Sequence, residues 1–339
     1  MPKSNIEDFA KSLKCVIDEI KDNPQMESGP EYQKFSDAFK NMANAESLGK
    51  IIRQFENIFI EANINSRRSI LEVGSGYGVN LLILKFLGFD RVCGIELIES
   101  MNKNANFLIN IAKKYVKFSL DDCYSLCGNA EATNFTNGEF DNVIAIEVIS
   151  HVPSIDRFLR EVNRILKDEG SFIIRDGNNH YCPYYRRKFL REWARVRDAE
   201  LKKRIVFLKQ HFPDIDPQFR ASIALHTELL SLNDVKDAVS EIIRTNKLPM
   251  NLYFEGYAPV FSQSGIWVEY GLYPTKVTQQ LKLYGFSSKK KVYIGSARGF
   301  PFELLEKIVN LFPDKIRFLI RPSFMVYAKK IDVVKYLVI

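Results

Sequence analysis

The sequence predicts an α/β fold, in which an open, mostly parallel sheet of seven strands is covered by helices on both faces. From residue 69 onward, short apolar runs alternate with amphipathic segments, and 69–73 and 80–88 form the first such pair. The runs are mainly apolar, as in strands that are buried on both sides. A turn rich in glycine follows the first run, at the place where such sheets bind ligands.

The alternation continues to residue 176, stops for about ninety residues, and then resumes. We expect seven strands, at 69–73, 91–97, 123–127, 142–148, 171–176, 290–296 and 321–330. The helices expected between them cover 80–88, 100–117, 155–167 and 274–286. This order predicts three parts: a helical N-terminal extension over 1–66, a core over 67–177 and 271–339, and a mainly helical insertion over 178–270.

Composition and charge narrow the class of protein. Apolar residues make up 46% and charged residues 26% of the 339 residues, which is typical of a globular enzyme. The net charge of +7 permits an anionic partner without requiring one. No run of about eighteen apolar residues could span a bilayer, and the first twenty residues lack the features of a secretory signal. Five cysteines without framework spacing favour a reducing compartment, so we expect a cytoplasmic protein.

The turn "ILEVGSGYGVN" at 70–80 departs from two known kinds of nucleotide-binding loop. A dinucleotide fingerprint needs a small third residue at position 79, where this chain has Val79; its third glycine is Gly78 instead. A phosphate-binding loop is excluded, because no Gly-Lys-Ser/Thr follows. Glu72 would also repel a pyrophosphate, whereas it suits a cation or a hydrogen-bond donor.

A second carboxylate defines the other end of the expected ligand. Glu96 ends the second predicted strand, and a carboxylate there can accept hydrogen bonds from both hydroxyls of a ribose. Acids at 72 and 96 around three glycines therefore describe a site for a nucleoside that carries positive charge.

The ordered motifs resemble those of class I S-adenosylmethionine-dependent methyltransferases. "ILEVGSGYGVN" and the following "GIEL" are similar to the first motif of that family and the acid after its second strand. The stretch "LCGNAEATNFTNGEFDNVIAIEVISHVPSIDRFLREVNRILKDEGSFII" is similar to the pattern of its small-molecule members: G-D-A-E, F-D-x-V, a strand, His-Val, a helix and L-K-x-x-G. The resemblance covers 69–176, and 274–330 is consistent with the reversed final hairpin of the family.

The resemblance implies a Rossmann-like fold, S-adenosylmethionine as cofactor, and roles for particular residues. Asn129 stands where the family more often has Asp, and its amide oxygen can still accept from the adenine amino group. The implied contacts are Gly74, Ser75, Gly76 and Gly78 with the methionine part and ribose, Glu72 with the amino-acid end, Glu96 with the ribose, Asn129 and Ala130 with the adenine, and Glu147 at the rim towards the acceptor.

Two histidines are candidates for proton transfer. His151 follows the fourth strand, and either packing or a role as general base would suit it; we favour packing. Asp176 and His180, after the fifth strand, form a second possible acid–base set. Cys123 and Cys127 begin a CxxxCxxC spacing whose third position is Ala130, so we expect no cluster and no metal site.

Acceptor choice is expected to depend on the insertion 178–270, which we interpret as a lid over the acceptor. Asn178, Tyr181 and Arg186 are its candidate substrate contacts. The basic helix 186–204 could be a solvated face, which we favour, or a clamp for a phosphate or carboxylate.

The sequence thus predicts methyl transfer to O, N or C of a small molecule, with an anionic acceptor as one option. Two alternatives stay open: an RNA or protein methyltransferase that docks through the basic helix, and a non-catalytic cofactor-binding protein of the same fold. No RNA-binding module and no Asn/Asp-Pro-Pro-Tyr/Phe motif are recognisable, which argues against the first.

Overall fold

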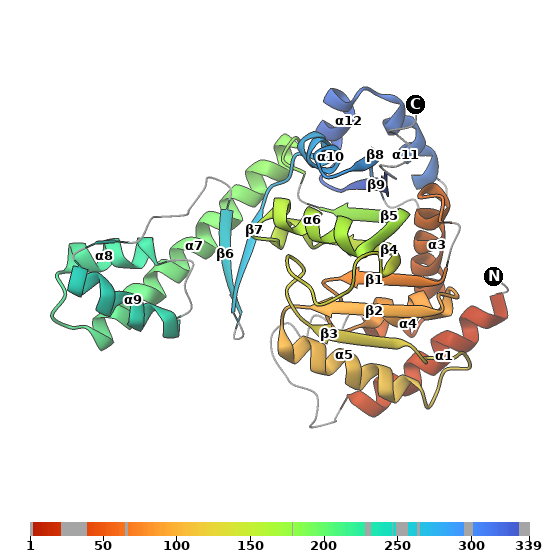
Figure 1. The fold of residues 1–339 in the computed structure, drawn as a ribbon, viewed down its shortest axis with the longest axis horizontal. Coiled ribbons are helices and arrows are strands. Elements are labelled where there is room, and N and C mark those ends of the chain that lie inside the picture. The colour runs from red at the N-terminus through yellow and green to blue at the C-terminus, as the bar shows by residue number, and fades with distance from the viewer. Residues whose placement is uncertain are drawn as a thin grey trace.

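A computed structural model describes residues 3–21, 39–64, 67–177, 179–227, 232–245, 247–248, 257–262, 265–294 and 301–331. One sheet of seven strands forms its centre, in the order β3-β2-β1-β4-β5-β9-β8 (Figure 1). The pairs from β3 to β5 are parallel, and β9 is antiparallel to both of its neighbours. The strands are β1 (Ser69–Val73), β2 (Arg91–Glu96), β3 (Cys123–Cys127), β4 (Phe140–Ile146), β5 (Leu166–Asp176), β8 (Phe286–Val292) and β9 (Phe324–Lys330). The predicted fold class is confirmed.

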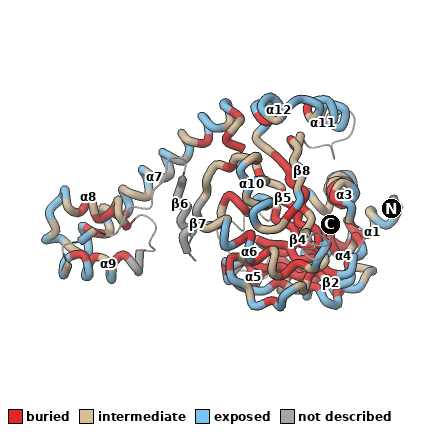
Figure 2. The backbone as a smooth tube through the Cα atoms, turned by 45° about the horizontal axis from the view of Figure 1, so that its top comes forward, coloured by how far each residue is buried: buried red, intermediate tan, exposed pale blue. Residues whose placement is uncertain are grey.

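Successive side chains of each strand point to opposite faces of the sheet, so each face has its own apolar core. Ile70 belongs to the core under α1, α3, α4 and α5, whereas Leu71 belongs to the core under α6 and α10. Figure 2 shows the buried residues gathered along the sheet between these helices. The helices are α1 (Lys3–Ile20), α3 (Ala45–Glu61), α4 (Val79–Phe86), α5 (Glu99–Ala112), α6 (Ile155–Ile165) and α10 (Pro274–Leu283).

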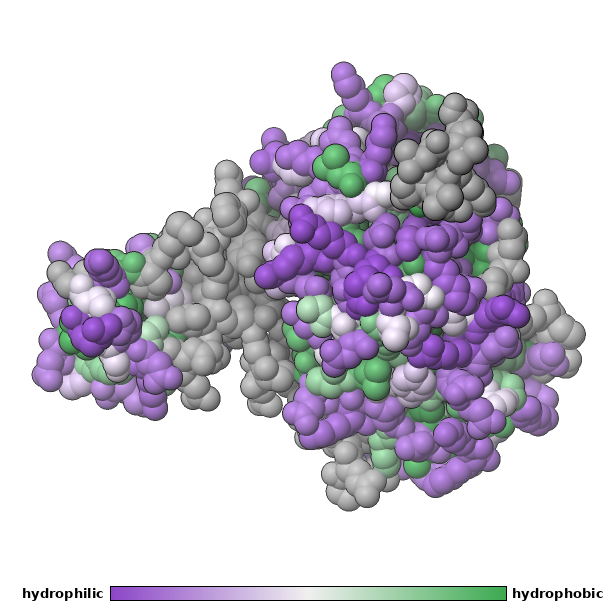
Figure 3. Space-filling view, viewed as in Figure 1, coloured by the Kyte–Doolittle hydropathy of each residue, from purple (hydrophilic) through white to green (hydrophobic). Residues whose placement is uncertain are grey.

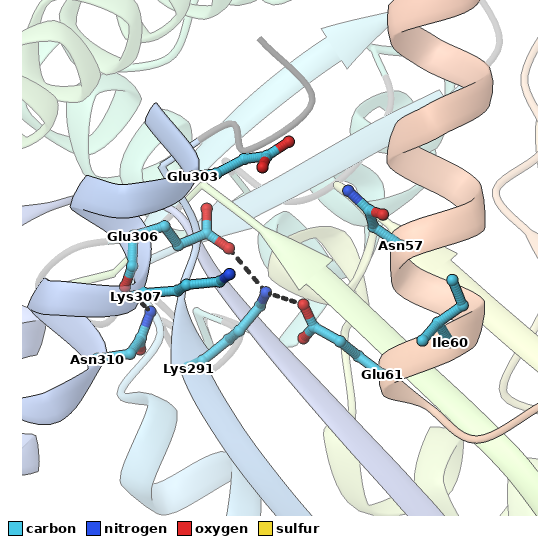
Figure 4. A pocket seen from close by; sticks show the side chains of 8 residues that line it. All are labelled: Asn57, Ile60, Glu61, Lys291, Glu303, Glu306, Lys307 and Asn310. Carbon is cyan, nitrogen blue, oxygen red and sulfur yellow. Dashed lines mark hydrogen bonds and ion pairs between the residues drawn. The ribbon is translucent and has the colours of Figure 1, made fainter. Parts of the chain in front are cut away.

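The N-terminal helices are fastened to the core by polar contacts as well as by packing. Lys291 of β8 donates to Glu61 of α3 and to Glu306 of α11 (Phe302–Leu311), at 2.7 Å each. Figure 4 shows this Lys291 side chain between the two carboxylates, in a hollow of about 350 Å³. The buried Glu306 also accepts from the backbone N–H of Ile294 at 2.8 Å. Lys291 and its two carboxylate partners therefore join α3 and α11 to the end of β8.

The insertion forms an arm that projects away from the sheet (Figure 1). Its long first helix, α7 (Pro183–His211), carries α8 (Pro217–His226) and α9 (Leu232–Thr245), which share a small apolar cluster around Leu208 and Ile223. A hairpin of β6 (Tyr257–Ser262) and β7 (Gly265–Tyr270) follows. At its base, Asn179 pairs with Leu272, and the backbone N–H of His180 donates to the Leu272 carbonyl at 2.8 Å.

Several observed boundaries differ from the expected ones, including those of α5, which ends at Ala112, and those of β5 and β8. β5 begins at Leu166, immediately after α6, because Phe140 of β4 pairs with Leu166 before a shift in register. β8 begins at Phe286, and the predicted final hairpin also contains α11 and α12 (Asp314–Ile320) between its strands. Within the described part of the chain, no helix is long and apolar enough to cross a membrane. Hydrophilic side chains cover much of the visible surface of the core (Figure 3).

Phe172 tests the packing of the sheet against α6. Its fully buried ring lies between Phe158 and Phe286, with ring centroids 5.9 and 6.1 Å away. Replacing it by alanine is expected to lower the free energy of unfolding by about 3–5 kcal/mol, because a cavity replaces the ring. Urea denaturation followed by circular dichroism measures this loss. Leu283→Ala, at a side chain that is 81% exposed, is the control and should change stability by less than about 0.5 kcal/mol.

Candidate functional site

The glycine turn after β1 adopts a backbone that favours glycine at three positions. Gly74, Gly76 and Gly78 have φ values of +67°, +51° and +78°. A Cβ atom at Gly74 would lie 2.4 Å from Val148 Cγ2, and one at Gly78 would lie 2.9 Å from Ala105 Cβ. At Gly76 the same test meets no atom of the described residues within 4 Å. The outer glycines are therefore required by packing, and the middle one borders open space.

Glu96, the last residue of β2, holds this turn in place. Its Oε2 accepts from the backbone N–H of Gly76 at 2.8 Å, and its Oε1 accepts from the N–H of Ile98 at 3.0 Å. The backbone N–H of Gly74 donates to the carbonyl of Ile95 at 2.8 Å. Each carboxylate oxygen can accept a second hydrogen bond, so Glu96 can hold the turn and still receive a ligand hydroxyl.

A cavity of about 260 Å³ lies beside the turn, at the carboxyl ends of β1, β2, β3 and β4. Apolar side chains such as Ile95, Ile98 and Met101 line it together with a small number of polar groups. Seven of the residues expected at the site meet here, namely Gly74, Gly76, Glu96, Asn129, Ala130, Glu147 and His151. Glu72, Ser75 and Gly78 do not line the cavity.

Glu72 lies in the interior of β1, next to the turn. Its side chain is 2% exposed, and Asn80 Nδ2 of α4 donates to its Oε1 at 2.6 Å. No described residue forms a hydrogen bond to its Oε2. Burial raises the pKa of Glu72 to about 8. A buried acceptor with an open position favours a ligand that brings a donor or a positive charge.

The side chain of Ser75 points into the protein. Its Oγ lies 3.0 Å from Ser125 Oγ, which also accepts from Asn102 Nδ2 at 2.9 Å. A Cβ on Gly94 of β2 would come within 2.5 Å of Ser75 Oγ, so this glycine makes room for the serine. Ser75 can therefore contact a ligand only through its backbone, while its hydroxyl supports the base of the turn.

The residues that come directly after β3 in the chain form another side of the cavity. Asn129 Oδ1 accepts from the backbone N–H of Glu131 at 2.9 Å and so fixes a tight turn beside Ala130. Glu131 is 8% exposed, accepts from the N–H of Ser154 at 2.5 Å, and forms an ion pair with Arg157 at 2.8 Å. The sequence did not mark Glu131 as a support of the site, because its partners follow the next strand.

Glu147 lies just beyond β4, at the rim of the cavity. Its φ of +57° is uncommon for a residue other than glycine. Glu147 Oε2 accepts from the N–H of Gly177 at 2.8 Å, and Arg175 Nε lies 3.4 Å from its Oε1. His151 ends a short 3-10 helix, Ile149–His151, and lines the same cavity. The backbone after β4 thus directs a carboxylate and an imidazole to one opening.

Asp176 and His180 do not line this cavity. Asp176 is fully buried and accepts from the N–H of Ser150 at 3.2 Å. His180 is 8% exposed and lies edge-on to Phe189 and Tyr273 at the base of the arm. Burial lowers the pKa of His180, and the positive charge of Arg186 lowers it further.

The expected substrate contacts are placed differently. Asn178 lies outside the described residues. The hydroxyl of Tyr181 forms a hydrogen bond with Thr275 Oγ1, and its ring packs on Tyr273. Arg186 is exposed near the start of α7. Neither Tyr181 nor Arg186 lines the cavity beside the glycine turn.

Comparison with known proteins agrees with this geometry. Residues 71–174 match the family model described as "Methyltransferase domain". The chain contains a class I S-adenosylmethionine-dependent methyltransferase domain. The predicted family and its cofactor, S-adenosylmethionine, are thereby confirmed.

Several relatives are similar to part of this chain. The "Ubiquinone/menaquinone biosynthesis C-methyltransferase UbiE" of Rickettsia prowazekii is 32% identical over 143 residues, which are 42% of this chain and 57% of that protein. The match thus spans little more than half of that relative. An "Uncharacterized protein" of Methanocaldococcus jannaschii is 28% identical over 57% of this chain and 67% of its own.

Solved structures of similar architecture include S-adenosylmethionine-dependent methyltransferases. The protein from Methanosarcina mazei is 16% identical, with 80% of this chain and 97% of that chain covered and a TM-score of 0.43. The protein from Mesorhizobium loti is 12% identical, with 77% and 90% covered and a TM-score of 0.41.

The raised pKa of Glu72 in this methyltransferase domain predicts how stability depends on pH. Because the folded protein holds a proton on Glu72 up to about pH 8 and the unfolded chain loses it near 4.5, rising pH within this window favours unfolding. Relative to Glu72→Gln, the free energy of unfolding of the wild type should fall by several kcal/mol between pH 5 and pH 8. Each pH unit within this window lowers it by about 1.4 kcal/mol. Urea denaturation at both pH values measures this difference. Parallel curves for wild type and the variant would contradict the assignment, and Glu99→Gln, at an exposed acid, is the control.

Proposed function

We propose that this chain transfers the methyl group of S-adenosylmethionine to a small-molecule acceptor. The observation that carries the proposal is the glycine turn held by Glu96, with the open side of Gly76 facing a cavity that is lined mainly by apolar side chains. Such a cavity takes a nucleoside whose ribose is received by a carboxylate.

Each part of the cofactor has a partner of suitable chemistry. Glu72 lies next to the turn but does not line the cavity, and its Oε2 has no hydrogen-bond partner among the described residues. We assign it to the ammonium group of the methionine part, whose positive charge would replace the proton that burial keeps on this carboxyl. Glu96 suits the ribose hydroxyls, because both of its oxygens keep one acceptor position beside their backbone donors. Asn129 and Ala130 border the place of the adenine. Glu147 lies at the open rim, where the acceptor must enter.

The bound cofactor supplies a methyl group on a sulfonium, whose leaving thioether is neutral. The protein therefore needs chiefly to hold the acceptor in line with that bond and to exclude water. The apolar lining around Ile95, Ile98 and Met101 provides a dry wall. A base is needed only if the nucleophile loses a proton as it attacks, and His151 at the rim is in place for that role.

Carbon is the acceptor atom that we favour. The support is the relative from Rickettsia prowazekii, whose name describes a C-methyltransferase and which shares 32% identity over its matched part.

We also propose that the reaction takes place in the cytoplasm. All five cysteines are free thiols, as is usual in a reducing compartment.

Cofactor binding is the first test. Glu96→Ala and Gly76→Arg should each weaken binding of S-adenosylhomocysteine at least tenfold by isothermal titration calorimetry. The first loses the clamp on the turn, and the second places a large side chain in the open space beside Gly76. Glu99→Ala, at a nearby exposed carboxylate, is the control and should bind as wild type does. Undiminished binding in both variants would defeat the site assignment.

Turnover separates an enzyme from a cofactor-binding protein of the same fold. The protein is incubated with S-adenosylmethionine and a fractionated extract of small metabolites, and S-adenosylhomocysteine is measured by mass spectrometry. Release that depends on the extract, with a product heavier by one methylene, supports the proposal. Tight cofactor binding without any such release across the fractions favours the non-catalytic alternative.

A further inference from the structure

A second hollow, of about 530 Å³, opens next to the cofactor cavity. It lies between α3, the carboxyl end of β5, the end of β8 and the segment that leads into β9. Glu147 lines both spaces, so they meet at this residue. A molecule in the second hollow could therefore present an atom at the rim of the first.

The hollow is lined by an excess of positive charge. Among the described residues, its lining includes Lys50, Arg175 and Arg321 together with one carboxylate, Glu147. Lys50 is already paired with Glu46 at 2.6 Å, and Arg175 approaches Glu147 through Nε at 3.4 Å. Arg321 forms no ion pair and no side-chain hydrogen bond with any residue that the structure describes. The balance favours a ligand that carries negative charge.

The guanidinium of Arg175 and the backbone around Arg321 are held in position by their surroundings. The guanidinium of Arg175 lies over the Tyr293 ring, 5.7 Å from its centroid, which orients its plane. The backbone around Arg321 is fixed by the fully buried Asn179. Its Nδ2 donates to the Arg321 carbonyl at 2.8 Å, and its N–H donates to the Pro322 carbonyl at 3.0 Å. Little reordering of the backbone is then needed when a ligand binds.

The remaining lining is of two kinds. Ile51, Tyr293, Ile294 and Pro322 provide apolar surface, and Ser47, Gln54 and Ser323 provide hydroxyl and amide groups. A guanidinium binds a carboxylate or a phosphate through a pair of parallel hydrogen bonds, which matches one charged end of a ligand. The apolar walls match a carbon skeleton or ring beyond that end.

We propose that this hollow is the acceptor site and that Arg321 and Arg175 hold a carboxylate or phosphate of the acceptor. The remainder of the acceptor lies along Tyr293 and extends past Glu147 towards the cofactor cavity. This inference rests on the proposed methyl transfer and names the class of its acceptor, a small organic anion with an apolar part. It moves the anion clamp from α7, where the sequence suggested Arg186, to two residues on either side of the insertion.

The test uses two probes that separate the two anions, benzoate and phenyl phosphate. Each is titrated into the full chain saturated with S-adenosylhomocysteine, and the dissociation constant is measured by calorimetry. We expect at least one probe to bind, with a dissociation constant raised tenfold or more in Arg321→Gln and in Arg175→Gln. Arg53→Gln is the matched control, because Arg53 is exposed on α3 and does not line the hollow. It should bind the probe as wild type does.

A second readout keeps the two proposals separable. Arg321→Gln should bind S-adenosylhomocysteine within twofold of wild type, since Arg321 does not line the cofactor cavity. Failure of the wild type to bind the cofactor product would overturn the proposed function, even if the anion site persists. If neither probe binds to the wild type, the acceptor site is overturned. So would equal binding by wild type and Arg321→Gln, or a loss confined to Arg186→Gln.

Discussion

The carboxylate of Glu96 joins two segments that lie 20 residues apart in the chain, and the site depends on this contact. The parallel pairing of β1 with β2 and the hydrogen bond from the Gly74 N–H to the Ile95 carbonyl bring the end of β2 close to the turn after β1. By accepting from Gly76 and from Ile98, Glu96 fixes the height of the turn over the sheet and the start of α5 together. The floor of the cofactor cavity is thus set before any ligand arrives.

Polar contacts also hold the segment that follows β4. Glu147 adopts a left-handed backbone conformation, and the N–H of Gly177 and the guanidinium of Arg175 hold its side chain. Such a conformation carries a cost that the neighbouring strand must offset. In return, a single side chain borders both the cofactor cavity and the hollow beside it. A carboxylate there can contact a molecule in either space.

Local patterns were sufficient to predict the elements that build the first cavity. Strand ends, glycines and acids at 72 and 96 lie within one short stretch, so their spacing carries the geometry. The sequence could not indicate that Asn80 would bind Glu72 or that Ser75 would face Ser125, because these contacts depend on the packing of α4 and β3.

The second hollow could not be predicted from the sequence, for a different reason. Arg175 and Arg321 come from opposite sides of the insertion and meet only because β9 lies against β5 in antiparallel register. The sequence suggested the basic run on α7 as a possible anion clamp instead, because its charges are adjacent in the chain. α11 and α12 were not anticipated either, since the late segment was interpreted as a simple strand pair.

The arm leaves the core and returns to it at neighbouring points, where Asn179 and Leu272 form a bridge. Whatever lies between these residues closes a loop whose ends are already fixed, and the entropic cost of such a loop grows only slowly with its length. The core can therefore tolerate great variation in what is grafted at this junction. Evolution could lengthen, shorten or exchange the arm while Asn179 continues to anchor the backbone of Arg321.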